Sequence, residues 1–302
     1  MIRGALSSLA RNESLGGLLS RTPIARTVVK RVVGGDSVTD AIAVAAELAD
    51  IGRWISLERS APPATDDREA EAVLADYVAL VDQIGAAGLT GVAEVSVFPE
   101  SLAADGSFDR LETLCRHATL EGVAVMVGMG PAEHVAATLE AVAGLQADAL
   151  HIGATIQASL LRSEGDCELF ANQRVRLVKG GRREPAGVAH DQPIETDKAF
   201  IRCAKILMAG DGAPSFATHD ARLIDILEAL TARVGRPRQT YEYAFYLGRL
   251  DGAQERLAAA GERVRVYVPY GPDWFERLVG GLAEQPTSIA GAVRSLLPGA
   301  TG

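Results

Sequence analysis

Residues 150–157 read LHIGATIQ, a short run that is apolar almost throughout and ends on a neutral amide. Similar runs recur along the chain, separated by stretches with apolar residues at i, i+3 and i+4 spacing. The eight runs are Trp54–Leu57, Gly91–Phe98, Val123–Met129, Leu150–Gln157, Val175–Lys179, Ser215–Thr218, Tyr241–Leu247 and Val264–Val268. Apolar strands that alternate with helices indicate a parallel sheet, because each crossover lays a helix on a face of the sheet.

Eight such units predict an α/β fold, a TIM-like β/α barrel with eight parallel strands. An open doubly wound sheet is the alternative, but it normally carries G-x-G-x-x-G after an early strand, and this sequence lacks that motif. We expect residues 1–50 to form an N-terminal helical segment and residues 51–302 to form the barrel. The helical patterns are Asp66–Ile84, Phe108–Leu120, Ala132–Val142, Glu195–Met208, Ala221–Val234 and Asp273–Leu296.

Composition narrows the class of partner. The 302 residues carry a net charge of −9 and no Lys/Arg-rich run, which argues against nucleic acid or anionic lipid and favours a small ligand or a protein partner. Three cysteines without CxxC spacing indicate neither a disulfide framework nor a metal site. No stretch approaches 18 uncharged apolar residues, so we expect no integral membrane segment and a cytoplasmic protein.

Functional residues of a β/α barrel follow the C-terminal ends of its strands. Gln157 ends its strand with an amide that either suits the edge of a flavin ring or pairs with backbone. The segment Arg176–Gly181 (RLVKGG) ends in glycines that let a ligand approach the backbone, and Lys179 is either a ligand contact or an ordinary ion-pair partner. His219 either donates to a ligand or orients its turn.

Several blocks, taken together, resemble the proline dehydrogenase family in its short bacterial form. They are Arg176–Gly180, Arg183–Pro185, Phe216–Asp220, Arg265–Trp274 and Ala283–Pro286, in the family's order. The resemblance implies a barrel that binds FAD, hydride transfer from L-proline to the flavin N5 with formation of pyrroline-5-carboxylate, and reoxidation by a quinone, with a peripheral position at the membrane for quinone access. The flavin contacts that it implies are Met129, Gln157, Arg176, Lys179, Gly180, Gly181, Thr218 and His219, with Arg176 as the catalytic cation.

The substrate side departs from the family's pattern. Phe98 stands where the family has a lysine, and Gly128-Met129-Gly130 replaces an Asp-x-Glu motif. Gly280 and Gly281 replace an arginine pair that clamps the proline carboxylate through charge-assisted bonds. We therefore predict that Phe98, Gly128, Gly280 and Gly281 line a roomier and less charged substrate pocket.

These residues leave three hypotheses for function. The first is an FAD-dependent oxidoreductase that acts on a C–N bond of an amine or amino acid other than proline. The second is a genuine L-proline dehydrogenase with a rearranged clamp that uses Arg182, Arg183 or Arg277. The third is a non-catalytic barrel that serves as a binding or scaffold protein, although a scaffold has no need of the flavin contacts.

Overall fold

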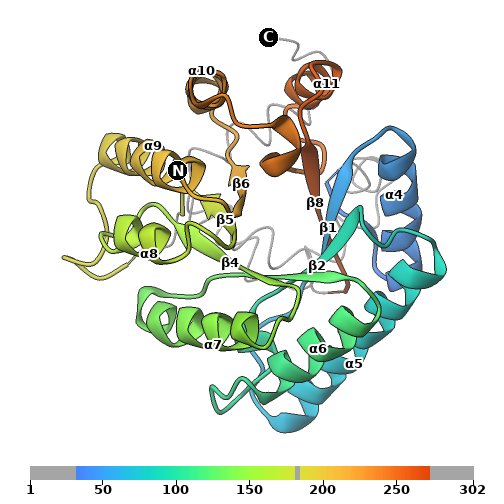
Figure 1. Cartoon of the computed structure of the whole chain (residues 1–302). Coiled ribbons are helices and arrows are strands. Elements are labelled where there is room, and N and C mark those ends of the chain that lie inside the picture. Colours follow the sequence, from blue (N-terminus) through green and yellow to red (C-terminus); the bar gives the residue numbers. More distant parts are fainter. Residues whose placement is uncertain (1–31, 181–183, 273–302) are drawn as a thin grey trace, which may run out of the picture.

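Eight parallel strands close into a barrel in the computed structural model, which describes residues 32–180 and 184–272. The strands follow one another around the barrel in sequence order, and β8 pairs with β1 (Figure 1). They are β1 (Trp54–Arg59), β2 (Ala93–Val97), β3 (Ala124–Val127), β4 (Ile152–Gln157), β5 (Arg174–Val178), β6 (Ala213–Ala217), β7 (Glu242–Tyr246) and β8 (Val264–Tyr270). The predicted TIM-like barrel is confirmed.

Helices surround the sheet on its outside. They are α4 (Val38–Asp50), α5 (Asp67–Ala86), α6 (Asp109–Leu120), α7 (Val135–Ala147), α8 (Ser163–Leu169), α9 (Pro193–Ala209), α10 (Ala221–Val234) and α11 (Asp251–Ala259), with 3₁₀ turns η1 (Pro99–Ser101), η2 (Ala132–His134) and η3 (Arg238–Thr240). The short helices α8 and α11 were not predicted. The predicted helix over 273–296 lies outside the described residues. No helix in the described part of the chain is long and apolar enough to cross a bilayer.

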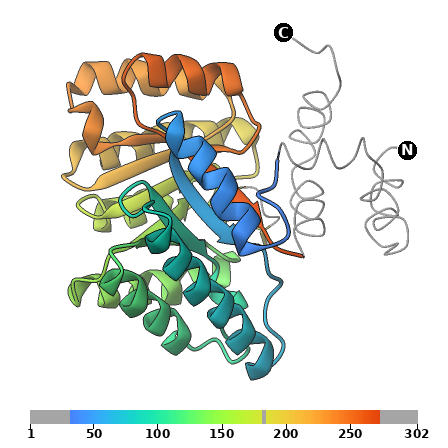
Figure 2. The ribbon, with the colours of Figure 1, turned by 90° about the vertical axis from the view of Figure 1, so that its right-hand side faces the viewer.

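Helix α4 belongs to the predicted leading segment but packs on β1, β8 and α5 (Figure 2). A capping box between Ser37 and Asp40 begins it, and Ala41 and Ala45 are fully buried against the barrel. The predicted division at residue 50 therefore falls between two elements that pack together. The remainder of the leading segment, residues 1–31, lies outside the described residues.

The two faces of the barrel sheet differ in polarity. Alternate residues such as Ile55, Leu57, Val95 and Val97 form the apolar core with the helices. Many of the intervening residues, which face the lumen, are polar or charged although they are buried: Ser56, Glu94, Ser96, Thr155, Arg176, Ser215, Glu242 and Arg265. Because a barrel interior is usually filled by branched apolar side chains, this lumen is built for polar contacts.

Candidate active site

The C-terminal ends of β4, β5 and β6 bring most of the predicted ligand contacts together. Gln157 is the last residue of β4 and is buried, and its Nε2 donates to the carbonyl oxygen of Gly130 at 3.0 Å. This bond ties the end of β4 to the loop after β3. The backbone pairing that was the alternative for Gln157 is therefore present at its amide nitrogen.

Arg176 reaches from β5 across the lumen to β1 and β2. Its Nη1 donates to Ser96 Oγ at 3.1 Å, and its Nη2 donates to Ser56 Oγ at 2.7 Å and to Glu94 Oε1 at 2.5 Å. The Arg176 side chain is 6% exposed, and its guanidinium lies 5.2 Å from the ring centre of Tyr267. Both terminal nitrogens are thus fixed, while Nε is buried without a hydrogen-bond partner among the described residues.

Two neighbours of Arg176 also carry buried polar atoms without a described partner. Thr155 on β4 and Ser215 on β6 stand level with Arg176 in the parallel register, so the three form one row across three adjacent strands. Thr155 Oγ1 and Ser215 Oγ lack a hydrogen-bond partner within residues 32–180 and 184–272. Because buried polar groups are normally satisfied, this row fits a polar ligand that supplies the missing partners. Alternation with apolar neighbours was the only sequence signal for Thr155 and Ser215, and sequence reasoning missed both.

Lys179 and Gly180 follow β5. Lys179 forms an ion pair with Asp197 of α9 and lies 3.8 Å from Asp220 Oδ2, so its ammonium group is already paired. Gly180 has a φ of +81°, and a Cβ added there would overlap Ser159 Oγ. Only glycine fits this turn, which brings its backbone close to the end of β4.

Thr218 and His219 follow β6. Burial and the nearby Arg249 lower the pKa of His219 to about 4, so its ring is neutral at pH 7. His219 Nε2 accepts a hydrogen bond from the backbone N–H of Tyr246 at 2.9 Å. The single ring proton therefore sits on Nδ1, which can donate. Thr218 Oγ1 accepts from the backbone N–H of Asp220 at 3.2 Å and fixes the turn.

The remaining predicted contacts are placed differently or not described. The Met129 side chain is buried in the apolar core with Val125 and Val127, so a ligand contact by Met129 would have to use its backbone. Gly181, Gly280 and Gly281 lie outside the described residues. Their assignment stays a prediction.

The C-terminal ends of β2 and β3 and the residues that follow them lie on the other side of the barrel mouth, and are here called the β2–β3 rim. A Cβ added at Gly128 would lie 2.8 to 2.9 Å from three ring atoms of Phe98, so the ring takes the space that a side chain at 128 would need. At Gly130, an added Cβ would lie 3.4 Å from both carboxylate oxygens of Glu100. An aromatic ring therefore takes the space beside Gly128, and a carboxylate faces Gly130. The roomier and less charged pocket stays a prediction, because Gly280 and Gly281 lie outside the described residues.

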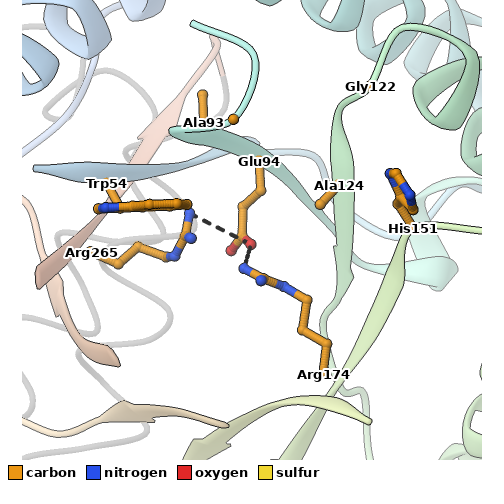
Figure 3. A pocket seen from close by; sticks show the side chains of 9 residues that line it. Trp54, Ala93, Glu94, Gly122, Ala124, His151, Arg174 and Arg265 are labelled. Atoms are coloured by element: carbon orange, nitrogen blue, oxygen red, sulfur yellow. Dashed lines mark hydrogen bonds and ion pairs between the residues drawn. The ribbon is translucent and has the colours of Figure 1, made fainter. Parts of the chain in front are cut away.

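A small cavity of about 80 Å³ opens at the opposite end of the barrel (Figure 3). Trp54 and Arg174, which begin β1 and β5, line it together with Glu94 and Arg265. Figure 3 shows Arg174 and Arg265 directed at the Glu94 carboxylate from two sides. Glu94 thus connects this cavity to Arg176 in the lumen.

The C-terminal ends of β4, β5 and β6 and the residues that follow them, here called the β4–β6 rim, carry groups that suit a flavin. The rim combines a neutral histidine donor, an amide, a close backbone approach at glycine and a buried guanidinium with an unpaired Nε, which are the kinds of group that hold and tune a flavin ring. Among residues 32–180 and 184–272, no group of three His, Cys, Asp or Glu side chains is arranged to hold a metal ion.

Comparisons with known proteins show the family of this chain. A model of the proline dehydrogenase family matches residues 41–274. Proline dehydrogenase 1 of Bacillus subtilis subsp. natto is 27% identical over 303 aligned positions, which cover 98% of this chain and 99% of that protein. Proline dehydrogenase of Deinococcus radiodurans is 27% identical over 281 positions, which cover 90% and 91% of the two chains.

A solved structure shares the fold. Proline utilization A from Bdellovibrio bacteriovorus, inactivated by N-propargylglycine, matches with a TM-score of 0.79 at 19% identity. The match covers 95% of this chain and 37% of that chain, so this chain spans little more than a third of the length of that protein.

Proposed function

This chain belongs to the proline dehydrogenase family, and from that membership we propose that it is an FAD-dependent oxidoreductase of a C–N bond in an amine or amino acid other than proline. When bound, the flavin would accept the two electrons that leave the substrate. The β4–β6 rim would hold it, with Gln157, Gly180 and the Nδ1 proton of His219 at its edges. Arg176 would offset negative charge that develops on the ring.

The contact between Phe98 and Gly128 carries the proposal of an altered substrate. An aromatic ring in place of a lysine removes a charged substrate contact, and the glycine opposite leaves the ring its space. The carboxylate of Glu100 faces Gly130, two residues beyond Gly128. An aromatic face beside a carboxylate suits an amine, because both attract a cation and the ring also supplies an apolar wall.

One observation favours the second candidate, a genuine L-proline dehydrogenase. Relatives that align over nearly the whole chain carry the name proline dehydrogenase at 27% identity. The electron acceptor is proposed to be a quinone, which would place the protein at the membrane surface during turnover.

The third candidate, a scaffold barrel, would leave the row of Thr155, Arg176 and Ser215 without a function.

The test is an absorbance spectrum of the purified protein, followed by anaerobic additions to the same sample. We expect a flavin band that L-proline leaves unchanged and that a larger or carboxylate-free cyclic amine bleaches. Bleaching by proline at a rate above that of every other amine would establish the second candidate. Absence of a flavin band after reconstitution with FAD would favour the scaffold and overturn the proposed function.

A further inference from the structure

The lumen below the rim holds a buried charge network of five residues. Arg174, Arg176 and Arg265 surround Glu94, and Arg265 also forms a two-pronged pair with Glu242. Glu94 and Glu242 have side chains that are 2% and 5% exposed. Three guanidinium groups thus face two carboxylates, and the network keeps one surplus positive charge in the lumen.

Glu94 is the only carboxylate of this network that contacts Arg176. Its Oε1 accepts from Arg176 Nη2 at 2.5 Å, while its Oε2 accepts from Arg174 and lies 3.6 Å from Arg265 Nη1. Burial alone would raise the pKa of Glu94, but the three guanidinium groups outweigh it and bring the pKa to about 2. The carboxylate is therefore charged at every pH at which the protein would work.

The position of Glu94 decides which part of Arg176 is available to a ligand. Glu94, Ser56 and Ser96 occupy both terminal nitrogens from the β1 and β2 side of the barrel. The donors left over are the second N–H of Nη1 and Nε, and Nε is buried without a partner among the described residues. Arg176 itself stands in the row with Thr155 and Ser215. A charged acceptor holds a guanidinium more firmly than a hydroxyl does, so Glu94 is the strongest of the three anchors.

We propose that Glu94 is the positioning residue for Arg176 and sets how much of its positive charge reaches a flavin in the β4–β6 rim. The inference rests on the proposed function, because it takes Arg176 as the cation beside the ring. Glu94 contacts the β4–β6 rim through Arg176. Glu94 acts from within the lumen. It holds the Arg176 guanidinium in place and partly neutralises its charge.

The inference predicts the sign of a change in the flavin's reduction potential. Glu94→Gln keeps the size and an acceptor oxygen but removes the negative charge, so Arg176 is less neutralised and reduction of the flavin becomes easier. We expect the midpoint potential, measured by anaerobic dye equilibration, to rise by about 30 mV, which is about tenfold in the equilibrium constant of a two-electron couple. An unchanged potential would overturn the inference.

Two further variants separate positioning from general structure. Glu242→Gln removes an equally buried carboxylate that pairs with Arg265 instead of Arg176, and we expect less than half the shift of Glu94→Gln. In an Arg176→Gln background, Glu94→Gln should also shift the potential by less than half of its effect in the native protein. A shift of the same size in both backgrounds would show that Glu94 does not act through Arg176.

Loss of the Glu94 charge leaves buried arginines less compensated, which can prevent folding. Glu94→Asp keeps the charge and withdraws the carboxylate by one methylene, so it should fold and raise the potential in the same direction by a smaller amount. A wild-type protein that takes up no FAD would overturn the proposed function together with this inference. Flavin uptake with a potential that none of the Glu94 variants moves would overturn the inference alone.

Discussion

The β4–β6 rim and the β2–β3 rim of the barrel differ in how closely they follow the residue pattern expected of the family. On the first, Gln157, Gly180 and His219 stand where the family's flavin contacts are expected, beside a row of buried polar atoms that lack hydrogen-bond partners among the described residues. On the second, the ring of Phe98 fills the space at Gly128, where the sequence predicted a departure from the family's pattern. The two sides rest on different strands, β4 to β6 for the first and β2 and β3 for the second, and the bond from Gln157 to Gly130 joins them.

The largest expected effect tests the β4–β6 rim. Arg176→Gln removes the buried guanidinium, and we expect flavin reduction by the best amine to slow by about 100-fold or more, as happens when one preorganised donor is lost. Stopped-flow absorbance with flavin-loaded protein measures this rate. Arg202→Gln is the control, because Arg202 forms a half-exposed ion pair with Glu164 away from the rim. A loss below tenfold in a flavin-loaded variant would contradict the role of Arg176.

A second variant tests the tight turn of the same rim. Gly180→Ala must adopt a left-handed conformation and also crowd Ser159, so we expect the free energy of unfolding to fall by about 2–4 kcal/mol. Gly187→Ala is the matched control: Gly187 has a φ of +86° with open space around it, and its cost should be about 1–2 kcal/mol. Equal losses in urea titrations would show that the approach to Ser159 is not tight.

The contact of Phe98 with Gly128 tests the β2–β3 rim. Gly128→Ala should lower the free energy of unfolding by about 1–3 kcal/mol, because the ring must move. The loss should largely vanish in a Phe98→Ala background, and a double-mutant cycle measures this coupling. Gly130→Ala should cost less, since its added Cβ meets only the flexible end of Glu100. Additive losses would mean that Phe98 and Gly128 do not share this space.

The smallest expected effect concerns pH. The pKa of His219 is about 4 in the folded protein against 6.5 unfolded, so the unfolded chain binds the proton first and stability falls as pH drops from 6.5 to 4. In His219→Gln, the free energy of unfolding should fall by about 1–2 kcal/mol less over this pH range than in the native protein. Urea unfolding at pH 7 and pH 4.5 measures it. An identical pH dependence in both proteins would show that the ring is not held neutral.

The sequence by itself determined the barrel and most of the β4–β6 rim. Apolar runs that alternate with helical patterns specify parallel strands under helices, and Gln157, Lys179 and His219 end or follow strands, where a barrel gathers its functional residues. The helices α8 and α11 were missed because they are seven and nine residues long, too short to show a clear apolar period.

Only the tertiary structure decided how side chains meet across the lumen. Arg176 contacts Glu94 and Ser56 at separations of 82 and 120 residues, and no local pattern encodes those distances. Likewise, the ring of Phe98 occupies the space at Gly128 because β2 and β3 are neighbours in the sheet, which spacing along the chain does not reveal. Periodicity reports which face of a strand is buried, whereas closure of the barrel decides which residues then face one another.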